Sequence, residues 1–211
     1  MTVDSAASPP KTLAPVFGAT PVPLDLVDDL VDGVAPRTLS EVDALERGGL
    51  STSMNTRILR LLDGDGDFLW DDLELIAAHR DAYGHVWRWA GQYRSREMSI
   101  GVDPSQISTK MRMLFGDASA WREFATYSPV EQAVRFHCEV GRIHPFVNGN
   151  GRLARVYCQL MLSAAQPATE LTWSETSMTK ISERRKEYIR AIREADSTGD
   201  YSSIVVFATS P

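Results

Sequence analysis

The segment from His144 to Arg155 constrains this chain more than any other, because it places an imidazole, a glycine-rich turn and two arginines within twelve residues. Gly149 and Gly151 flank Asn150, so the backbone can turn tightly there and leave several N–H groups pointing in one direction. Where such a turn begins a helix, these donors and the positive end of the helix dipole form an anion site. The segment therefore predicts a turn that opens a helix and binds an anion.

The residues after this turn predict a helix with one buried face, because its apolar residues recur at helical spacing: Leu153, Val156, Tyr157, Leu160 and Met161. Arg152 and Arg155 are three residues apart and share the opposite face. Two guanidinium groups beside several backbone donors favour a polyphosphate ligand. His144 lies at the edge of this site, where an imidazole can act as a base on an incoming hydroxyl group.

Length and composition predict one domain, with an additional arm at the N-terminus. The chain has 211 residues, of which 43% are apolar, so it can bury a sizeable core. Its net charge of −6 argues against nucleic acid as a direct partner. The sequence shows no apolar run long enough for a membrane helix and no secretory signal, so we expect a cytoplasmic protein without membrane contact. Cys138 and Cys158 are interpreted as reduced core residues rather than a disulfide or a catalytic thiol.

The chain divides into three parts by composition. Residues 1–23 contain five prolines among small residues, which is typical of an extended arm or a flexible tail. Residues 24–62 predict N-terminal helices, and residues 63–211 predict the main domain. Ser40 is the expected N-cap of a helix that ends at Gly48 and Gly49, and Ser128 with Pro129 predicts another helix start. Helices are expected over residues 24–33, 40–47, 51–62, 68–83, 107–121, 129–143, 150–165 and 177–195.

Two shorter patterns also bear on the fold. Asp63, Asp65, Asp67 and Glu74 match the carboxylate positions of a calcium loop, but Phe68 stands where that loop needs glycine. We therefore favour a solvated turn in which Asp67 caps the helix 68–83, whose expected inner side is Leu69, Leu73, Ile76 and Ala77. Residues 93–102 are bounded by glycines and predict a β-hairpin. The predicted fold is mainly α, with this hairpin as its exception.

The aromatic and histidine side chains outside the motif are expected to have structural or solvated roles. His137 is expected to be structural, whereas His79 and His85 are expected to be solvated surface residues. Trp87 and Trp89 are expected in the core rather than as a platform for stacking bases.

The motif resembles the signature of the Fic (Fic/Doc) family, His-x-Phe-x-acid-Gly-Asn-Gly-Arg-x-x-Arg, and departs from it at Asn148. The resemblance extends over about residues 60–207. Trp89–Arg94 resembles the segment before the family's flap, and Tyr188–Ala191 resembles part of its C-terminal helices. Thr20–Asp25 together with Glu41–Glu46 is similar to a bacterial subgroup called mobile mystery protein B, which typically neighbours a helix-turn-helix protein.

This resemblance implies a Fic-type helical bundle with a short β-hairpin flap over the active site, and a protein adenylyltransferase that moves AMP from ATP to a Ser, Thr or Tyr hydroxyl of a target protein. His144 would be the general base, and Arg152 would stabilise the leaving pyrophosphate. Arg155 would contact the outer phosphate or orient the loop. The residues expected to hold the phosphates are Asn148, Gly149, Asn150, Gly151, Arg152 and Arg155. The residues expected to hold the target are Tyr93, Arg94, Met98 and Ile100.

Asn148 replaces the acid that binds Mg²⁺ in the family, and it leaves several alternatives open. An amide oxygen can bind Mg²⁺ or Mn²⁺ weakly, or Asn148 can serve only to form the turn. The substitution implies weaker metal binding, another nucleotide or transferred group, or loss of activity. The alternative function is therefore a nucleotide-binding regulatory or toxin–antitoxin-type protein, with a DNA-binding regulator as a more distant possibility.

Many Fic proteins are restrained by a glutamate that pairs with the second arginine of the signature. Glu46 is the nearest candidate for such an inhibitory residue, and Thr179–Arg184 contains a weaker one. An antitoxin-like partner and the absence of any restraint are the alternatives.

Overall fold

A computed structural model describes residues 28–34, 36, 38–173 and 181–210 of the chain. The expected arm at residues 1–23, Thr20–Asp25 and Thr179 lie outside these described residues. Within them the chain forms seven α-helices and no strand of a sheet, so the prediction of a mainly α fold is confirmed. The helices are α1 (Leu39–Leu62), α2 (Asp72–Tyr83), α3 (Ile107–Glu123), α4 (Pro129–Ile143), α5 (Asn150–Ala165), α6 (Ile181–Thr198) and α7 (Ser202–Thr209), with short 3₁₀ turns η2 (Asp67–Trp70) and η3 (Pro104–Gln106).

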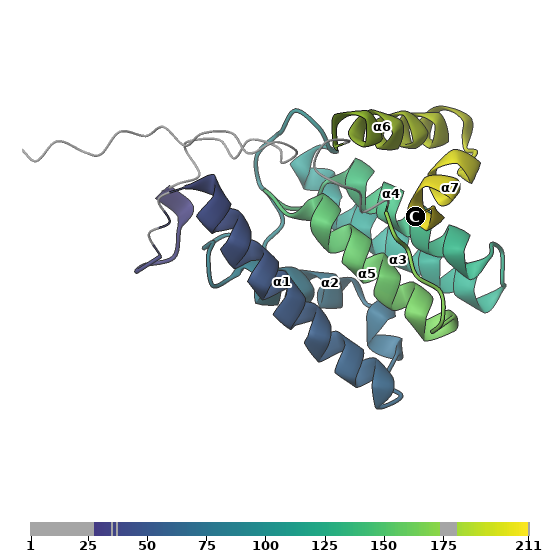
Figure 1. The fold of residues 1–211 in the computed structure, drawn as a ribbon, viewed down its shortest axis with the longest axis horizontal. Coiled ribbons are helices and arrows are strands. Elements are labelled where there is room, and N and C mark those ends of the chain that lie inside the picture. Colours follow the sequence, from purple (N-terminus) through teal and green to yellow (C-terminus); the bar gives the residue numbers. More distant parts are fainter. Residues whose placement is uncertain (1–27, 35, 37, 174–180, 211) are drawn as a thin grey trace, which may run out of the picture.

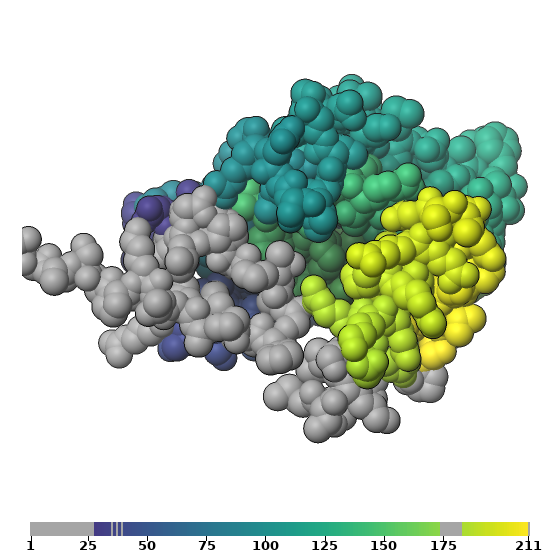
Figure 2. All heavy atoms as spheres, turned by 90° about the horizontal axis from the view of Figure 1, so that it is seen from above, coloured from purple at the N-terminus to yellow at the C-terminus, as the bar shows by residue number. Residues whose placement is uncertain are grey.

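Helices α4 and α5 pack side by side at the centre of the bundle (Figure 1). Helix α3 packs on α4, and α1 packs on α2 while also contacting α5. Helices α6 and α7 pack on each other, and α7 contacts α4. Figure 2 shows the C-terminal helices in yellow and the middle of the chain in teal, with green atoms between them. The loop between α4 and α5 therefore connects the two most central helices.

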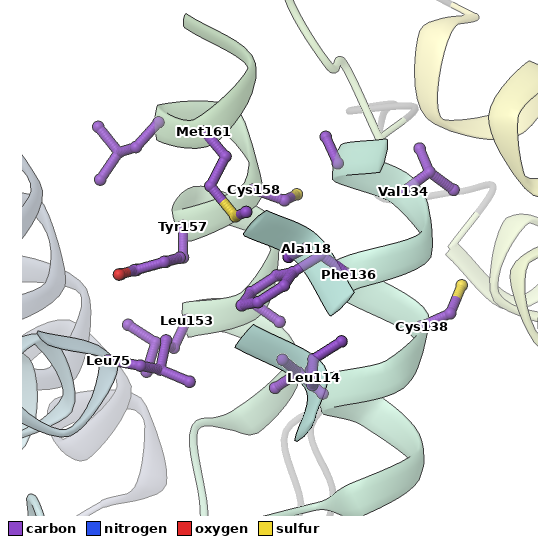
Figure 3. Close-up of a cluster of buried hydrophobic side chains, with 14 of the residues drawn as sticks. Leu75, Leu114, Ala118, Val134, Phe136, Cys138, Leu153, Tyr157, Cys158 and Met161 are labelled. Atoms are coloured by element: carbon purple, nitrogen blue, oxygen red, sulfur yellow. The ribbon is translucent and has the colours of Figure 1, made fainter. Parts of the chain in front are cut away.

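Apolar side chains of α3, α4 and α5 meet in the core, as Leu114, Phe136 and Tyr157 show in Figure 3. Phe136 and Tyr157 are stacked with ring centroids 5.8 Å apart, and Phe115 meets Phe136 edge-on at 5.2 Å. The hydroxyl of Tyr157 donates to the carbonyl of Leu69 at 3.1 Å, so this buried polar group is satisfied. Cys138 and Cys158 are buried, free thiols of the core, as predicted.

Helix α1 is continuous through Gly48 and Gly49, so the prediction of two helices separated there is wrong. A Cβ atom at Gly49 would lie 2.1 Å from both the carbonyl oxygen of Ala82 and Cε1 of His85. Glycine is needed here because α1 approaches the end of α2 very closely, not because the helix ends. The N-cap is Thr38 rather than Ser40, since Thr38 Oγ1 accepts from the N–H of Glu41 at 3.2 Å.

Helix α2 begins four residues later than predicted. Asp71, and not Asp67, is its N-cap, because Asp71 Oδ1 accepts from the N–H of Leu73 at 2.9 Å. The expected inner side is also wrong at Leu73, which is 64% exposed. The buried face of α2 consists of Leu75, Ala78, His79, Ala82 and Tyr83.

The carboxylates of the turn before α2 are exposed to solvent. Asp65 pairs with Arg60 at 2.7 Å, and Asp67 pairs with Arg122 at 3.0 Å. Within the described part of the chain, no group of three or more His, Cys, Asp or Glu side chains is placed to hold a metal ion.

A buried arginine fastens the second half of α1 to α2. Arg57 is 3% exposed, and its guanidinium lies 2.7 Å from Glu74 and 3.1 Å from Asp81. It also donates to the hydroxyl of Ser53 at 2.8 Å. Removing the partners of a buried guanidinium strongly destabilises the folded state. This end of α1 is therefore held in place.

The helices around the motif follow the prediction closely. Ser128 caps α4, since its hydroxyl accepts from the N–H of Glu131 at 3.2 Å, and Pro129 occupies the first helical position. Helix α5 spans the residues predicted for it. Among the described residues, no helix combines the length and apolar character that crossing a membrane would need.

Candidate active site

The loop of residues 144–149, here called the signature loop, turns the chain from α4 into α5. It begins at His144, which has left-handed backbone angles (φ 53°, ψ 61°), and ends at Gly149 (φ 80°). A Cβ atom at Gly149 would lie 2.6 Å from the ring of Tyr83, so glycine is required by both conformation and space. The first N–H groups of α5 then lack acceptors within their own helix and are available to an anion.

Asn150 holds the signature loop closed. Its side chain is buried; Oδ1 accepts from the N–H of Phe146 and Nδ2 donates to the carbonyl of Phe146, both at 2.8 Å. Both polar ends of the amide are therefore used inside the loop. The second hydrogen of Nδ2 and the backbone N–H remain as donors, so the expected contact of Asn150 with phosphate stays a prediction.

His79 lies directly behind the signature loop, and the expectation of a solvated side chain is wrong. It is fully buried, stacks on Phe146 with a centroid distance of 3.8 Å, and bonds Asn148 O through Nε2 at 3.1 Å. Burial lowers its pKa to about 4, so the ring is neutral at neutral pH. Helical spacing from Leu75 and Ala82 was the available signal, since it places residue 79 on the buried face.

His144 is half-buried where α4 meets the signature loop. Burial lowers its pKa and the positive charge of Arg94 lowers it further, while a hydrogen bond with the backbone of Gly141 acts in the opposite direction. The imidazole is therefore largely neutral at neutral pH and can accept a proton. This is the protonation state that a general base requires.

Arg94 is 3% exposed, which corrects its expected role as a target-binding residue. Its guanidinium donates to the carbonyls of His144 at 2.7 Å, Arg96 at 2.9 Å and Val102 at 2.5 Å. It thus lies between the two ends of the segment 94–102 and the beginning of the signature loop. An arginine has five N–H donors and can satisfy all three carbonyls, and its burial keeps the guanidinium away from a target protein.

The predicted β-hairpin at residues 93–102 is not formed, and this segment is a loop. The backbone N–H groups of Arg94 and Val102 donate to Pro145 and Ile143 at 2.9 Å and 3.2 Å. The two ends of the segment therefore pair with the residues around His144 rather than with each other. Ile100 is 53% exposed and Met98 is half-buried, whereas the hydroxyl of Tyr93 is buried.

Arg152 is paired with a carboxylate from α1. Its Nη2 lies 2.6 Å from Oε2 of Glu46, and Nη1 lies 3.8 Å from Asp43. Glu46 is 2% exposed, and its Oε1 also accepts from the indole N–H of Trp87 at 2.6 Å. The candidate inhibitory residue is therefore brought to the anion site, where it bonds the first arginine of the signature.

Arg155 points to the other side of α5. Its positive charge acts on the hydroxyl of Tyr188 on α6, and this hydroxyl lies 2.7 Å from Nε2 of His137. His137 is buried and structural, as predicted. The two arginines thus share a helix but not a partner, because Arg152 pairs with α1 whereas the charge of Arg155 acts on α6.

Asn148 is turned toward its own backbone and toward Glu46. Its Oδ1 accepts from the N–H of Gly149 at 2.8 Å, and its Nδ2 donates to Oε1 of Glu46 at 3.4 Å. The amide oxygen expected as a weak metal ligand thus accepts one hydrogen bond and keeps a second lone pair. The donor set around Asn148 does not fit a resident Mg²⁺ or Mn²⁺ site, since such ions prefer several carboxylate or water oxygens.

The sequence of this chain is similar to those of known proteins. Residues 70–162 match the model of the Fic/DOC family. The protein adenylyltransferase Fic of Nematostella vectensis is 32% identical over 96 residues, which are 44% of this chain and 22% of that protein. A probable protein adenylyltransferase of Sinorhizobium fredii is 31% identical over 109 residues, 48% of this chain and 55% of that protein. The match thus covers about half or less of these relatives.

Solved structures share the fold at low sequence identity. A Fic family protein from Desulfovibrio desulfuricans superposes with a TM-score of 0.59 at 23% identity and covers 89% of this chain and 56% of its own. An N-terminal Fic domain from Bartonella quintana with bound ADP gives a TM-score of 0.56 at 19% identity, covering 84% and 86%. These likenesses extend the similarity over most of the helical bundle.

Proposed function

We propose that this chain, whose residues 70–162 match the model of the Fic/DOC family, is a protein adenylyltransferase, which transfers AMP from ATP to a hydroxyl group of a target protein. The observation that carries the proposal is a neutral His144 at the start of the signature loop, whose other end begins α5, the helix that carries Arg152. A proton acceptor and an anion site are therefore joined by one short loop. The names of the similar adenylyltransferases of Nematostella vectensis and Sinorhizobium fredii support the same function.

The proposed step is a displacement at the α-phosphorus of ATP. His144 takes the proton of the target hydroxyl, whose oxygen forms a bond to the α-phosphorus. The bond from this phosphorus to the oxygen bridging the α- and β-phosphates breaks, and pyrophosphate leaves. The N–H groups of Gly151 and Arg152 and the Arg152 guanidinium stabilise the negative charge on the phosphates. Mg²⁺ or Mn²⁺ would be supplied with the nucleotide.

The target protein would lie along the loop of residues 94–102. Ile100 and Met98 remain the proposed contacts, because they are the expected target-binding residues that are not used to hold the loop. Arg94 and Tyr93 face inward and would support the loop instead. An extended segment of the target, carrying Ser, Thr or Tyr, could bond the exposed backbone of this loop.

Glu46 is proposed to restrain the transfer. The Glu46 carboxylate occupies the guanidinium of Arg152 at 2.6 Å, and a phosphate group would have to displace it. A charge-assisted pair of this kind is comparable in strength to the phosphate contact that replaces it. Removing the carboxylate charge should therefore raise the affinity for ATP.

The test uses ATP labelled at either the α- or the γ-phosphate, incubated with a bacterial lysate and Mg²⁺ or Mn²⁺. Wild type, Glu46→Gln and Glu46→Gln/His144→Ala are compared. We expect α-label on protein, more of it with Glu46→Gln, and none with the His144→Ala variant. Protein-bound γ-label without α-label would show phosphorylation instead. Absence of both labels from a Glu46→Gln protein that binds ATP would contradict the transferase proposal.

Asn148 favours a second candidate, a nucleotide-binding regulatory protein with little transfer activity. The amide removes a negative charge from the position that binds metal in the family, and its oxygen already accepts from Gly149. Such a protein would bind nucleotide equally well with and without divalent metal, whereas the transferase should need metal for turnover. Transfer of another phosphate-containing group and a helix-turn-helix partner also remain predictions from the resemblance.

A further inference from the structure

We propose that His79 of α2 is a positioning residue for the transfer, because it fixes the peptide unit from which α5 begins. This inference rests on the proposed function. The side chain of His79 is separate from the residues proposed to touch ATP, and it contacts the signature loop from behind. It would therefore act through the geometry of the loop and not on the reacting atoms.

The structure determines which nitrogen of His79 carries the proton. Nδ1 accepts from the backbone N–H of Gly91 at 2.9 Å, and a backbone N–H can only donate. The proton of the neutral ring must then be on Nε2, which donates to the carbonyl of Asn148 at 3.1 Å. The ring thus links two loops with one acceptor and one donor, and each is matched to its partner.

The carbonyl that His79 binds belongs to the peptide unit joining Asn148 and Gly149. The N–H at the other end of this unit donates to Asn148 Oδ1 at 2.8 Å. Both polar ends of the unit are therefore held, one by His79 and one by Asn148. Because this unit immediately precedes α5, its orientation decides where the first free N–H groups of the helix point.

A second contact supports the same loop. The ring of His79 is stacked on Phe146 with an interplanar angle of 17°. Burial and the nearby positive charge of Arg152 both disfavour the protonated, charged form of His79. A proton on Nδ1 would also point at the N–H of Gly91. The neutral ring is thus the form that fits both neighbours.

Two variants separate the bonds of His79. His79→Gln keeps a side-chain N–H donor near the position of Nε2 and can still reach Asn148, but it loses the acceptor for Gly91. His79→Asn keeps an oxygen near the position of Nδ1 for Gly91 and loses the donor to Asn148. Both variants lose the ring that stacks on Phe146. Each is therefore the matched control for the other, with a similar cost in stability.

The variants are made in the full chain carrying Glu46→Gln, and kcat and KM for ATP are measured with α-labelled ATP, alongside urea unfolding. We expect kcat to fall at least about tenfold further with His79→Asn than with His79→Gln, although the two unfold at similar urea concentrations. Equal kcat values, or losses that follow stability alone, would overturn the proposal.

A binding measurement keeps this inference independent of the transfer reaction. Calorimetric titration with a non-hydrolysable ATP analogue measures the affinity of the anion site directly. The Kd should rise about tenfold more with His79→Asn than with His79→Gln. If the parent protein shows no transfer but this difference is found, the proposed function fails and the role of His79 stands. If the two Kd values agree, the role of His79 fails.

Discussion

Replacement of Asn148 by aspartate tests whether the amide at this position supports the Glu46–Arg152 pair. The Asn148 amide donates to the Glu46 carboxylate at 3.4 Å, so an aspartate would place two like charges side by side. At about 4 Å and an effective dielectric constant near 20, two unit charges repel by about 4 kcal/mol. Arg152 lies 2.6 Å from Glu46 and would offset part of this repulsion. We therefore expect a coupling free energy of about 2 kcal/mol.

The assay is a double-mutant cycle of unfolding in urea, without nucleotide or metal. It compares wild type, Asn148→Asp, Glu46→Gln and the double variant. Asn148→Asp should lower the free energy of unfolding by about 2 kcal/mol more in the wild-type background than in the Glu46→Gln background. Additive effects, within about 0.5 kcal/mol, would refute the reasoning, because they would mean that Asn148 and Glu46 do not interact.

The remaining predictions concern packing, capping and pH. Gly49→Ala should destabilise the fold by about 1–3 kcal/mol in urea unfolding, because its Cβ would meet the Ala82 carbonyl oxygen at 2.1 Å. Ser128→Ala should cost about 1 kcal/mol in the same assay through loss of the α4 N-cap. Transfer activity should persist at pH 6.5 and decline only below it, because the pKa of His144 is lowered; a decline centred above 6.5 would contradict this. Because His79 titrates near pH 4 when folded and near 6.5 when unfolded, the unfolded state binds the proton first. The free energy of unfolding should therefore fall as pH drops through that window, and less so in His79→Gln.

The parts of the site that the sequence could predict are those encoded within a few residues. The glycine-rich turn, the helix after it and the cap at Ser128 depend on local backbone preferences and on helical spacing. The structure accordingly forms α4 and α5 where they were expected. Glu46, to which the family resemblance pointed, does pair with an arginine of the signature, but that arginine is Arg152 and not the second one as expected; its inhibitory role stays a prediction.

The parts that the sequence could not predict depend on contacts between distant segments. Arg94 was expected on an exposed hairpin, but the carbonyls of His144 and Val102 draw its guanidinium inward. No local pattern carries that information. Gly49 was expected to end a helix because glycine often does so, whereas here the absence of a side chain allows α1 to lie against Ala82. Tertiary packing overrode the local preference in both cases.

The two halves of α1 are attached by different contacts. Arg57 ties the second half to α2 through buried ion pairs, whereas the first half, which carries Glu46, meets the signature loop on the far side of Gly48 and Gly49. Glycine lowers the cost of opening a helix locally by about 1 kcal/mol per residue. The backbone amides before Gly48 should therefore exchange their hydrogens with solvent faster than those around Arg57. Glu46 can then leave Arg152 through local opening of one helical turn while the rest of α1 stays folded.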